Sequence, residues 1–80
     1  MKIEFLELAN CLGATDDEGA MVFTYDFKHG TPKHVIVNPN PLASNFQRLE
    51  GAAASEDRID AAITAILAFL AERGFSATIS

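Results

Sequence analysis

Residues Ser55 to Gly74 have the sequence S-E-D-R-I-D-A-A-I-T-A-I-L-A-F-L-A-E-R-G, and this stretch decides the fold. The Ser55 hydroxyl can accept a hydrogen bond from a free amide of a first helical turn. Gly74 suits the left-handed residue that ends a helix, and Phe75 can then fold back on Leu70, as in a Schellman motif. Between these signals, apolar residues recur at helical spacing within one stripe. They are Ile59, Ile63, Ile66, Leu67 and Leu70. The stretch therefore predicts an amphipathic helix.

The opposite side of this helix consists of small residues, with no charge between Asp60 and Glu72. The small residues are Ala61, Thr64, Ala65, Ala68 and Ala71. Two interpretations stand: alanine is simply the best helix former, or the smooth face lets a second helix or a partner approach closely. Phe69 lies at the edge of the main stripe, and we expect it to make a second contact with the core.

The segment before the helix predicts a β-hairpin. Met21, Phe23, Tyr25 and Phe27 alternate with other residues, which is typical of a half-buried strand with an aromatic face. The residues K-H-G-T-P at 28–32 supply a turn, and a second strand over 33–38 closes the hairpin. The N-P-N-P run at 38–41 ends that strand, since proline cannot donate a ladder hydrogen bond.

The first segment, Lys2 to Leu12, is ambiguous. As a strand it places Ile3 and Phe5 on one face, but the phase slips at Leu6 unless a bulge intervenes. As a helix its apolar residues line up, with glycine following as a stop. We favour the strand, because the extended segments that follow need a partner. Residues 13–19, G-A-T-D-D-E-G, are predicted to form a turn.

The remaining segments complete the predicted fold. Leu42 to Ala54 connects the hairpin to the helix, and Phe46 and Leu49 are candidates for one helical turn on the core. After Gly74, alternation predicts a short last strand over 75–80, at the sheet edge. The expected fold is a single α+β domain over residues 1–80. It has a small antiparallel sheet of three or four strands, one long C-terminal helix packed on one face, and a short final strand.

Composition bounds the class of protein. The chain is 49% hydrophobic and 21% charged, as expected of a folded globular domain. Its formal net charge of −5, from 11 acidic and 6 basic residues, disfavours direct binding to nucleic acid. Cys11 is the single cysteine, so no intrachain disulfide can form, and a reducing cytoplasm is the default setting. The longest apolar run is far shorter than the ~20 residues that span a bilayer, so we expect a soluble protein without membrane contact.

Catalytic and metal motifs are weak. His29 and His34 flank the predicted hairpin turn, and with Asp26 or Cys11 they are candidate metal ligands, but the paired spacing of a zinc module is missing. Cys11 would need a lowered pKa and a histidine base to act as a nucleophile, and a small buried apolar role is favoured. The chain has neither a G-x-S-x-G elbow nor a glycine-rich phosphate loop. We expect no enzyme activity and no cofactor.

The acidic residues gather in two places, the predicted turn and the start of the helix. The candidate partner-binding residues are Asp16, Asp17, Glu18, Glu56, Asp57 and Asp60. Such residues either form ordinary solvated faces or make an acidic surface that steers the chain toward a basic protein groove.

On these six acidic residues, and on its small single domain, the chain resembles small phage-encoded anti-defence inhibitors of the anti-CRISPR type. The resemblance implies a non-catalytic inhibitor. Carboxylates would occupy Lys and Arg sites that a defence nuclease complex uses for nucleic acid, or the chain would block one subunit sterically.

Two other classes remain open. The chain is alternatively a structural or accessory subunit, stable as a homodimer or within a larger complex. A helix covers only one face of a sheet, and the other face, with Val22, Thr24, Leu6 and Leu8, would need cover. The third class is a small enzyme or metal protein that uses Cys11, His29 and His34.

Overall fold

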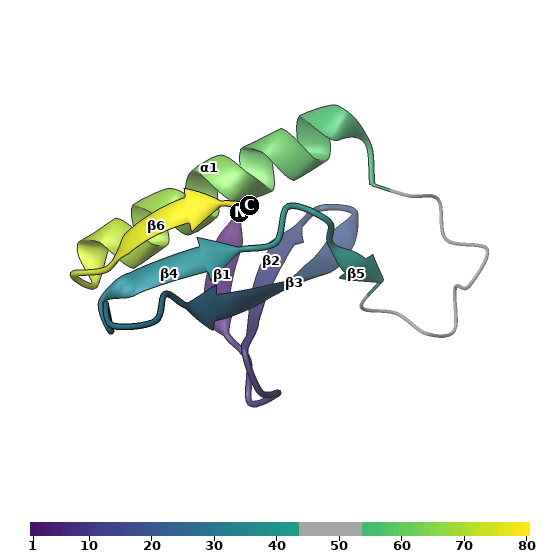
Figure 1. Cartoon of the computed structure of the whole chain (residues 1–80). Helices are drawn as coiled ribbons and strands as arrows, with labels where there is room; N and C mark the ends of the chain where they lie inside the picture. Colours follow the sequence, from purple (N-terminus) through teal and green to yellow (C-terminus); the bar gives the residue numbers. More distant parts are fainter. Residues whose placement is uncertain (44–53) are drawn as a thin grey trace.

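The sheet is built around one long strand, β3 (Gly19–Phe27), whose two halves pair with different partners. The computed structural model describes residues 1–43 and 54–80 (Figure 1). On one edge, β2 (Cys11–Asp16) pairs with the first six residues of β3 in antiparallel register. On the other edge, β4 (His34–Val37) pairs with the last three. The two-residue β5 (Leu42–Ala43) also pairs antiparallel with β3, at Met21 and Val22.

The strand order is β1-β2-β3-β4-β6, with β5 off this path. The edges are β1 (Lys2–Phe5) and β6 (Ser76–Ile79), and the helix α1 (Glu56–Glu72) precedes β6. The expectation of an antiparallel sheet with three or four strands is wrong in two respects. The path has five strands, and β6 runs parallel to β4. A parallel neighbour requires a long crossover, which the segment containing α1 supplies.

The extra strand comes from the residues predicted to be a turn. Residues 13–19 do not form one long turn, because β2 continues to Asp16 and only Asp17 and Glu18 join it to β3. Gly13 lies inside the strand, where a Cβ would approach Leu6 Cδ2 at 3.1 Å. Glycine therefore makes room here for a neighbouring side chain, although in sequence it resembles a turn residue.

The first segment is extended, as favoured, but it is two strands and not one. β1 ends at Phe5, a turn with Asn10 at φ 56° follows, and β2 begins at Cys11. The phase slip at Leu6 thus marks the end of a strand, not a bulge. Ile3 and Phe5 pair with Ala14 and Leu12.

The hairpin and the last strand are confirmed. Lys28 N–H donates to His34 O at 2.9 Å, and Gly30 lies within the turn at φ 76°. β6 is the edge strand beside β4. β5 is a further difference, because its residues lie in the segment expected to connect the hairpin to the helix. The predicted helical turn at Phe46 and Leu49 lies outside the described residues.

Both end signals of the helix are confirmed. The Ser55 side chain accepts a hydrogen bond from Arg58 N–H. At the other end Gly74 has φ 82°, and Phe75 N–H donates to Leu70 O while Gly74 N–H donates to Ala71 O. These two bonds define a Schellman motif.

The core lies between α1 and one face of the sheet (Figure 1). Its largest fully buried side chains are Phe23, Leu12, Ile66, Leu70, Val35 and Val37. The buried stripe of the helix is rotated from the predicted one. Ala62 is fully buried, whereas Ile59 and Leu67 are half-buried. A small residue at the line of contact lets the helix backbone approach the sheet. Phe69 packs against this core, as expected.

The second face of the sheet is not covered by the helix. Val22, Thr24 and Ile36 are half-buried there, and Leu8 in the β1–β2 turn is 65% exposed. On the far side of the helix, Ala61, Thr64, Ala68 and Ala71 are exposed and Ala65 is half-buried, so four of the five small residues of the predicted face lie on the surface.

A matched pair on β3 tests the position of the core. Phe23 and Phe27 share one face of the strand, but Phe23 is fully buried and Phe27 is 49% exposed. Phe23→Ala should lower the free energy of unfolding by about 3–5 kcal/mol, because it leaves a cavity. Phe27→Ala should cost roughly 1 kcal/mol, the scale of its ring contacts. Urea denaturation of both variants measures the difference, and equal losses would contradict the core assignment.

Candidate functional site

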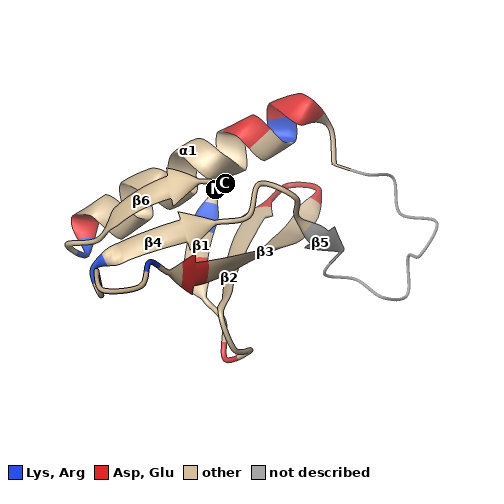
Figure 2. Cartoon of the chain, in the orientation of Figure 1, with Lys and Arg blue, Asp and Glu red and all other residues tan. Residues whose placement is uncertain are grey.

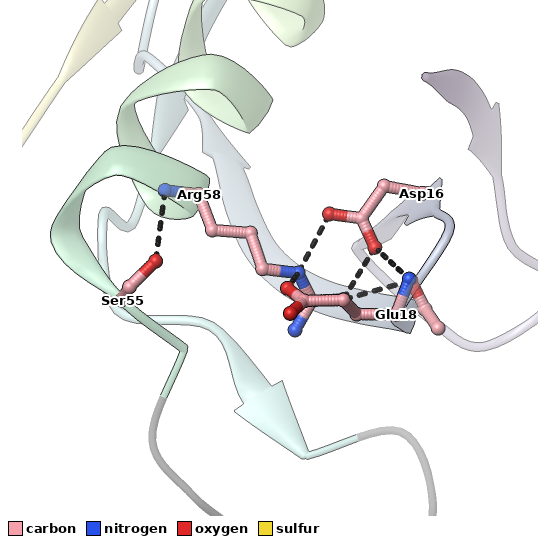
Figure 3. Close-up of polar contacts among 5 residues, drawn as sticks. Asp16, Glu18, Ser55 and Arg58 are labelled. Carbon is pink, nitrogen blue, oxygen red and sulfur yellow. Dashed lines mark hydrogen bonds and ion pairs between the residues drawn. The ribbon is translucent and has the colours of Figure 1, made fainter.

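Arg58 connects the start of the helix to the β2–β3 hairpin (Figure 3). Its Nε donates to Asp16 Oδ2 at 2.6 Å, and its Nη2 donates to Asp16 Oδ1 at 2.7 Å. Nη2 also donates to Gly19 O at 2.9 Å, and Glu18 Oε2 lies 3.1 Å from Nε. The guanidinium therefore binds the Asp16 carboxylate through two parallel hydrogen bonds, the strongest geometry for this pair. We call this contact the Arg58 bridge.

The hairpin turn is itself arranged to receive Arg58. Asp16 Oδ1 accepts a hydrogen bond from Glu18 N–H at 2.9 Å, which is the local pattern of an Asx turn. The same carboxylate thus closes the turn and holds the helix. Hydrogen bonding to Arg58 lowers the pKa of Asp16 from its usual 3.8, with the Glu18 amide as a smaller contribution. The bond to Asp16 raises the pKa of Arg58 in turn.

The bridge places all six candidate partner-binding residues at one end of the molecule (Figure 2). We call Asp16, Asp17, Glu18, Glu56, Asp57 and Asp60, together with Arg58, the acidic end. Six carboxylates against one guanidinium leave a charge of −5, equal to the formal charge of the whole chain. Among the other residues that the structure describes, four acidic side chains are balanced by four basic ones. The net charge of the described residues is therefore localised.

The six acidic residues differ in how they are held. Asp16 is half-buried and hydrogen-bonded to Arg58, so its role is to join the hairpin to the helix. Glu18 is exposed but shares Arg58. Asp17, Glu56, Asp57 and Asp60 are exposed, and none of these four side chains forms an ion pair within the described part of the chain. These four are available to a partner.

Arg58 was not singled out from the sequence, although a signal was present. A cation in the first helical turn is unfavourable against the helix dipole. Arg58 occupies such a position, three residues after the cap. A residue that opposes a local preference is a candidate for a specific tertiary contact, and here the contact is with a hairpin 42 residues away.

The remaining candidates are not brought together as a reactive site. Cys11 is buried in β2, where its Sγ contacts Ala9 O at 3.4 Å, while His29 is exposed in the β3–β4 turn. The ring of His34 lies between two hydroxyls of β6, 2.7 Å from Ser76 Oγ and 3.1 Å from Thr78 Oγ1. These bonds tie β4 to β6. Among residues 1–43 and 54–80 no three His, Cys, Asp or Glu side chains are grouped as metal ligands.

Comparison with protein-family models, with curated proteins and with solved structures finds no match. In the part of the chain that the structure describes, no helix is long and apolar enough to cross a membrane.

The Arg58 bridge predicts a specific response to acid. Because folding lowers the pKa of Asp16, the bridge stabilises the fold above the usual value of 3.8 and is lost as pH falls through the lower folded value. Asp16→Asn should be less stable than the wild type at neutral pH. The difference in thermal midpoint between the wild type and Asp16→Asn should narrow below about pH 4. Thermal midpoints recorded from pH 7 to pH 2 measure it.

Asp17→Asn is the matched control, since Asp17 is exposed and its side chain is not among the hydrogen-bond or ion-pair partners of Arg58. Its midpoints should follow the wild-type curve at every pH. A constant gap between Asp16→Asn and the wild type down to pH 2 would contradict the role given to the bridge.

Proposed function

We propose that this chain is a non-catalytic protein-binding module whose acidic end docks on a basic surface of another protein. The observation that carries the proposal is a charge of −5 on the hairpin turn and the helix start that the Arg58 bridge joins, while the acidic and basic side chains of the other described residues balance. A localised field of one sign steers association with an oppositely charged groove and fixes its orientation.

The acidic end is ordered in the free protein, which favours a role in binding over a role in solubility alone. A surface that is ordered before binding loses less conformational entropy when it docks. The hairpin turn is held by the Asp16 side chain, and the first helical turn is held by Ser55 and Arg58. The four available carboxylates, Asp17, Glu56, Asp57 and Asp60, are thus attached to a fixed framework.

The finer proposal is an inhibitor of the anti-CRISPR type. In this role the carboxylates of the acidic end form ion pairs with the Lys and Arg side chains that a defence nuclease complex uses to hold guide or target nucleic acid. The phosphate backbone dominates such binding, so a protein that covers those cations competes with it directly. Alternatively, the chain inhibits such a complex by binding one of its subunits and blocking that subunit sterically.

A second candidate, an accessory or self-associating subunit, is supported by the edge strand β6. Its residues S-A-T-I carry neither charge nor proline, the usual protections of an exposed edge. A thermal midpoint that rises with protein concentration would support this candidate, because association stabilises the folded state by mass action.

Charge reversal tests the leading proposal. Asp17→Lys with Asp60→Lys changes two exposed carboxylates without touching the bridge or the helix cap. Glu4→Lys with Glu7→Lys is the matched control, with the same change in charge on β1 and its turn. Tagged proteins are used to capture a partner from prokaryotic lysate at low and high salt. We expect capture of a nucleic-acid-handling complex, lost at high salt and about tenfold weaker for the acidic-end variant only.

The same variants test inhibition in cells. Expression of the wild type in bacteria with an active CRISPR system should restore plaque formation by a targeted phage, and the acidic-end variant should not. Equal capture and equal plaque counts for the two double variants would exclude the acidic end as the binding surface.

A further inference from the structure

A second surface lies at the opposite end of the helix, where the aromatic side chains gather. The described residues contain six aromatic side chains, and only Phe23 is in the buried core. The other five form a continuous ring cluster, which we call the aromatic end. They are Phe5, Tyr25, Phe27, Phe69 and Phe75.

The rings belong to four separate parts of the fold. Phe5 ends β1 and contacts Tyr25, Phe69 and Phe75, with centroids 5.9, 5.3 and 6.3 Å away. Phe27 ends β3 and contacts Tyr25 at 5.7 Å and Phe75 at 6.2 Å. None of the five rings is buried, and Phe5 and Phe27 are 40% and 49% exposed. Exposed rings that contact one another, in place of apolar residues scattered singly, mark a candidate interaction site.

Two cations are stacked on this cluster. The Arg73 guanidinium lies 3.6 Å from the centroid of the Phe69 ring, and its Nη1 donates to Phe69 O at 3.2 Å. The Lys33 ammonium lies 4.9 Å from the centroid of the Phe75 ring. Both residues are exposed. Stacking fixes the guanidinium plane and leaves further N–H donors for an incoming acceptor.

Three cations lie at the aromatic end, in contrast to the single guanidinium of the acidic end. Besides Lys33 and Arg73, the exposed Lys28 directly follows Phe27 in the chain. The acidic neighbours are Glu72, beside Arg73, and Glu4 and Asp26, which directly precede Phe5 and Phe27 and alternate to the other face of their strands. Glu7 lies in the turn that follows β1. Aromatic side chains and arginine are the residues most enriched in the energetically dominant parts of protein interfaces.

We propose that the aromatic end is a second docking surface, and that its occupant is an acidic protein segment that places an apolar side chain against Phe5 and Phe27. Flanking carboxylates of that segment bind Arg73 and Lys33. Charge complementarity selects the carboxylates, and the exposed rings select the apolar side chain. The chain then joins two partners, since the acidic end lies across the length of the helix, on the order of 25 Å away for 17 residues.

Two other occupants fit less well. Single-stranded nucleic acid also stacks on aromatic rings, but it needs a cationic track along its backbone, and three cations on a chain of charge −5 do not provide one. A second copy, docked through the same surface, would bring Arg73 and Lys33 close to their counterparts. Like charges that meet in an interface are unfavourable.

The only tyrosine, Tyr25, lies in the cluster, and the chain has no tryptophan, so tyrosine fluorescence reports on this surface alone. The probes are an array of short acidic peptides with leucine or valine at varied positions, free of aromatic residues. Charge-matched peptides with serine in place of the apolar residue, and oligothymidylate, complete the set. We expect members of the acidic apolar series to change the emission saturably, with binding at least tenfold weaker for the serine peptides.

Variants assign the binding to individual side chains. Phe27→Ser and Arg73→Glu should each weaken binding about tenfold or more. The matched controls are Leu8→Ser, an exposed aliphatic residue outside the ring cluster, and Lys2→Glu, an exposed cation on β1. Both controls should bind as the wild type does, and so should Asp17→Lys with Asp60→Lys, which keeps this test separate from that of the acidic end.

Four outcomes would overturn the proposal. They are the absence of binding across the array, equal binding of the serine peptides, tighter binding of oligothymidylate, and a dimer in sedimentation experiments that Phe27→Ser dissociates.

Discussion

The packing of α1 across one face of the curled sheet is the constraint on which the rest of the structure depends. Phe23 of β3 is buried with Ile66 and Leu70, and fully buried Ala62 lets the helix approach the strands. Burial of such side chains is the main favourable contribution in a domain of this size. Because the helix is fixed along its length, both its ends are fixed against the sheet.

At the first end, the helix brings a set of like charges onto a hairpin that is also acidic. This arrangement would be unfavourable without Arg58, whose guanidinium neutralises part of the charge at the junction and binds Asp16 through two hydrogen bonds. Asp17, Glu56, Asp57 and Asp60 are exposed to solvent. One cation therefore allows two acidic segments, distant in sequence, to form a single surface.

At the second end, the helix brings Phe69, Arg73 and Phe75 onto the ends of β1 and β3. Aromatic residues normally contribute most when they are buried. Here the aliphatic residues and Phe23 fill the core, and the other rings of the described chain cover one surface. The two ends thus differ in both charge and apolarity, which fits a protein with two distinct contacts.

The sequence by itself determined the helix with its caps, the β3–β4 hairpin, the final edge strand and the positions of the acidic residues. These features depend on local signals: capping side chains, periodicity of two or 3.6, and turn residues. Only the tertiary structure decided that residues 11–16 form a strand, that β6 runs parallel to β4, and which carboxylates are free. Glycine suits position 13 of the strand because Leu6 occupies the space where a Cβ would lie. Asp16 is bound within the fold because Arg58 reaches it from the helix. Both facts come from contacts between segments that are separate in the chain. The local sequence marks Arg58 as a cation at an unfavourable helix position, but it does not identify the partner of that cation.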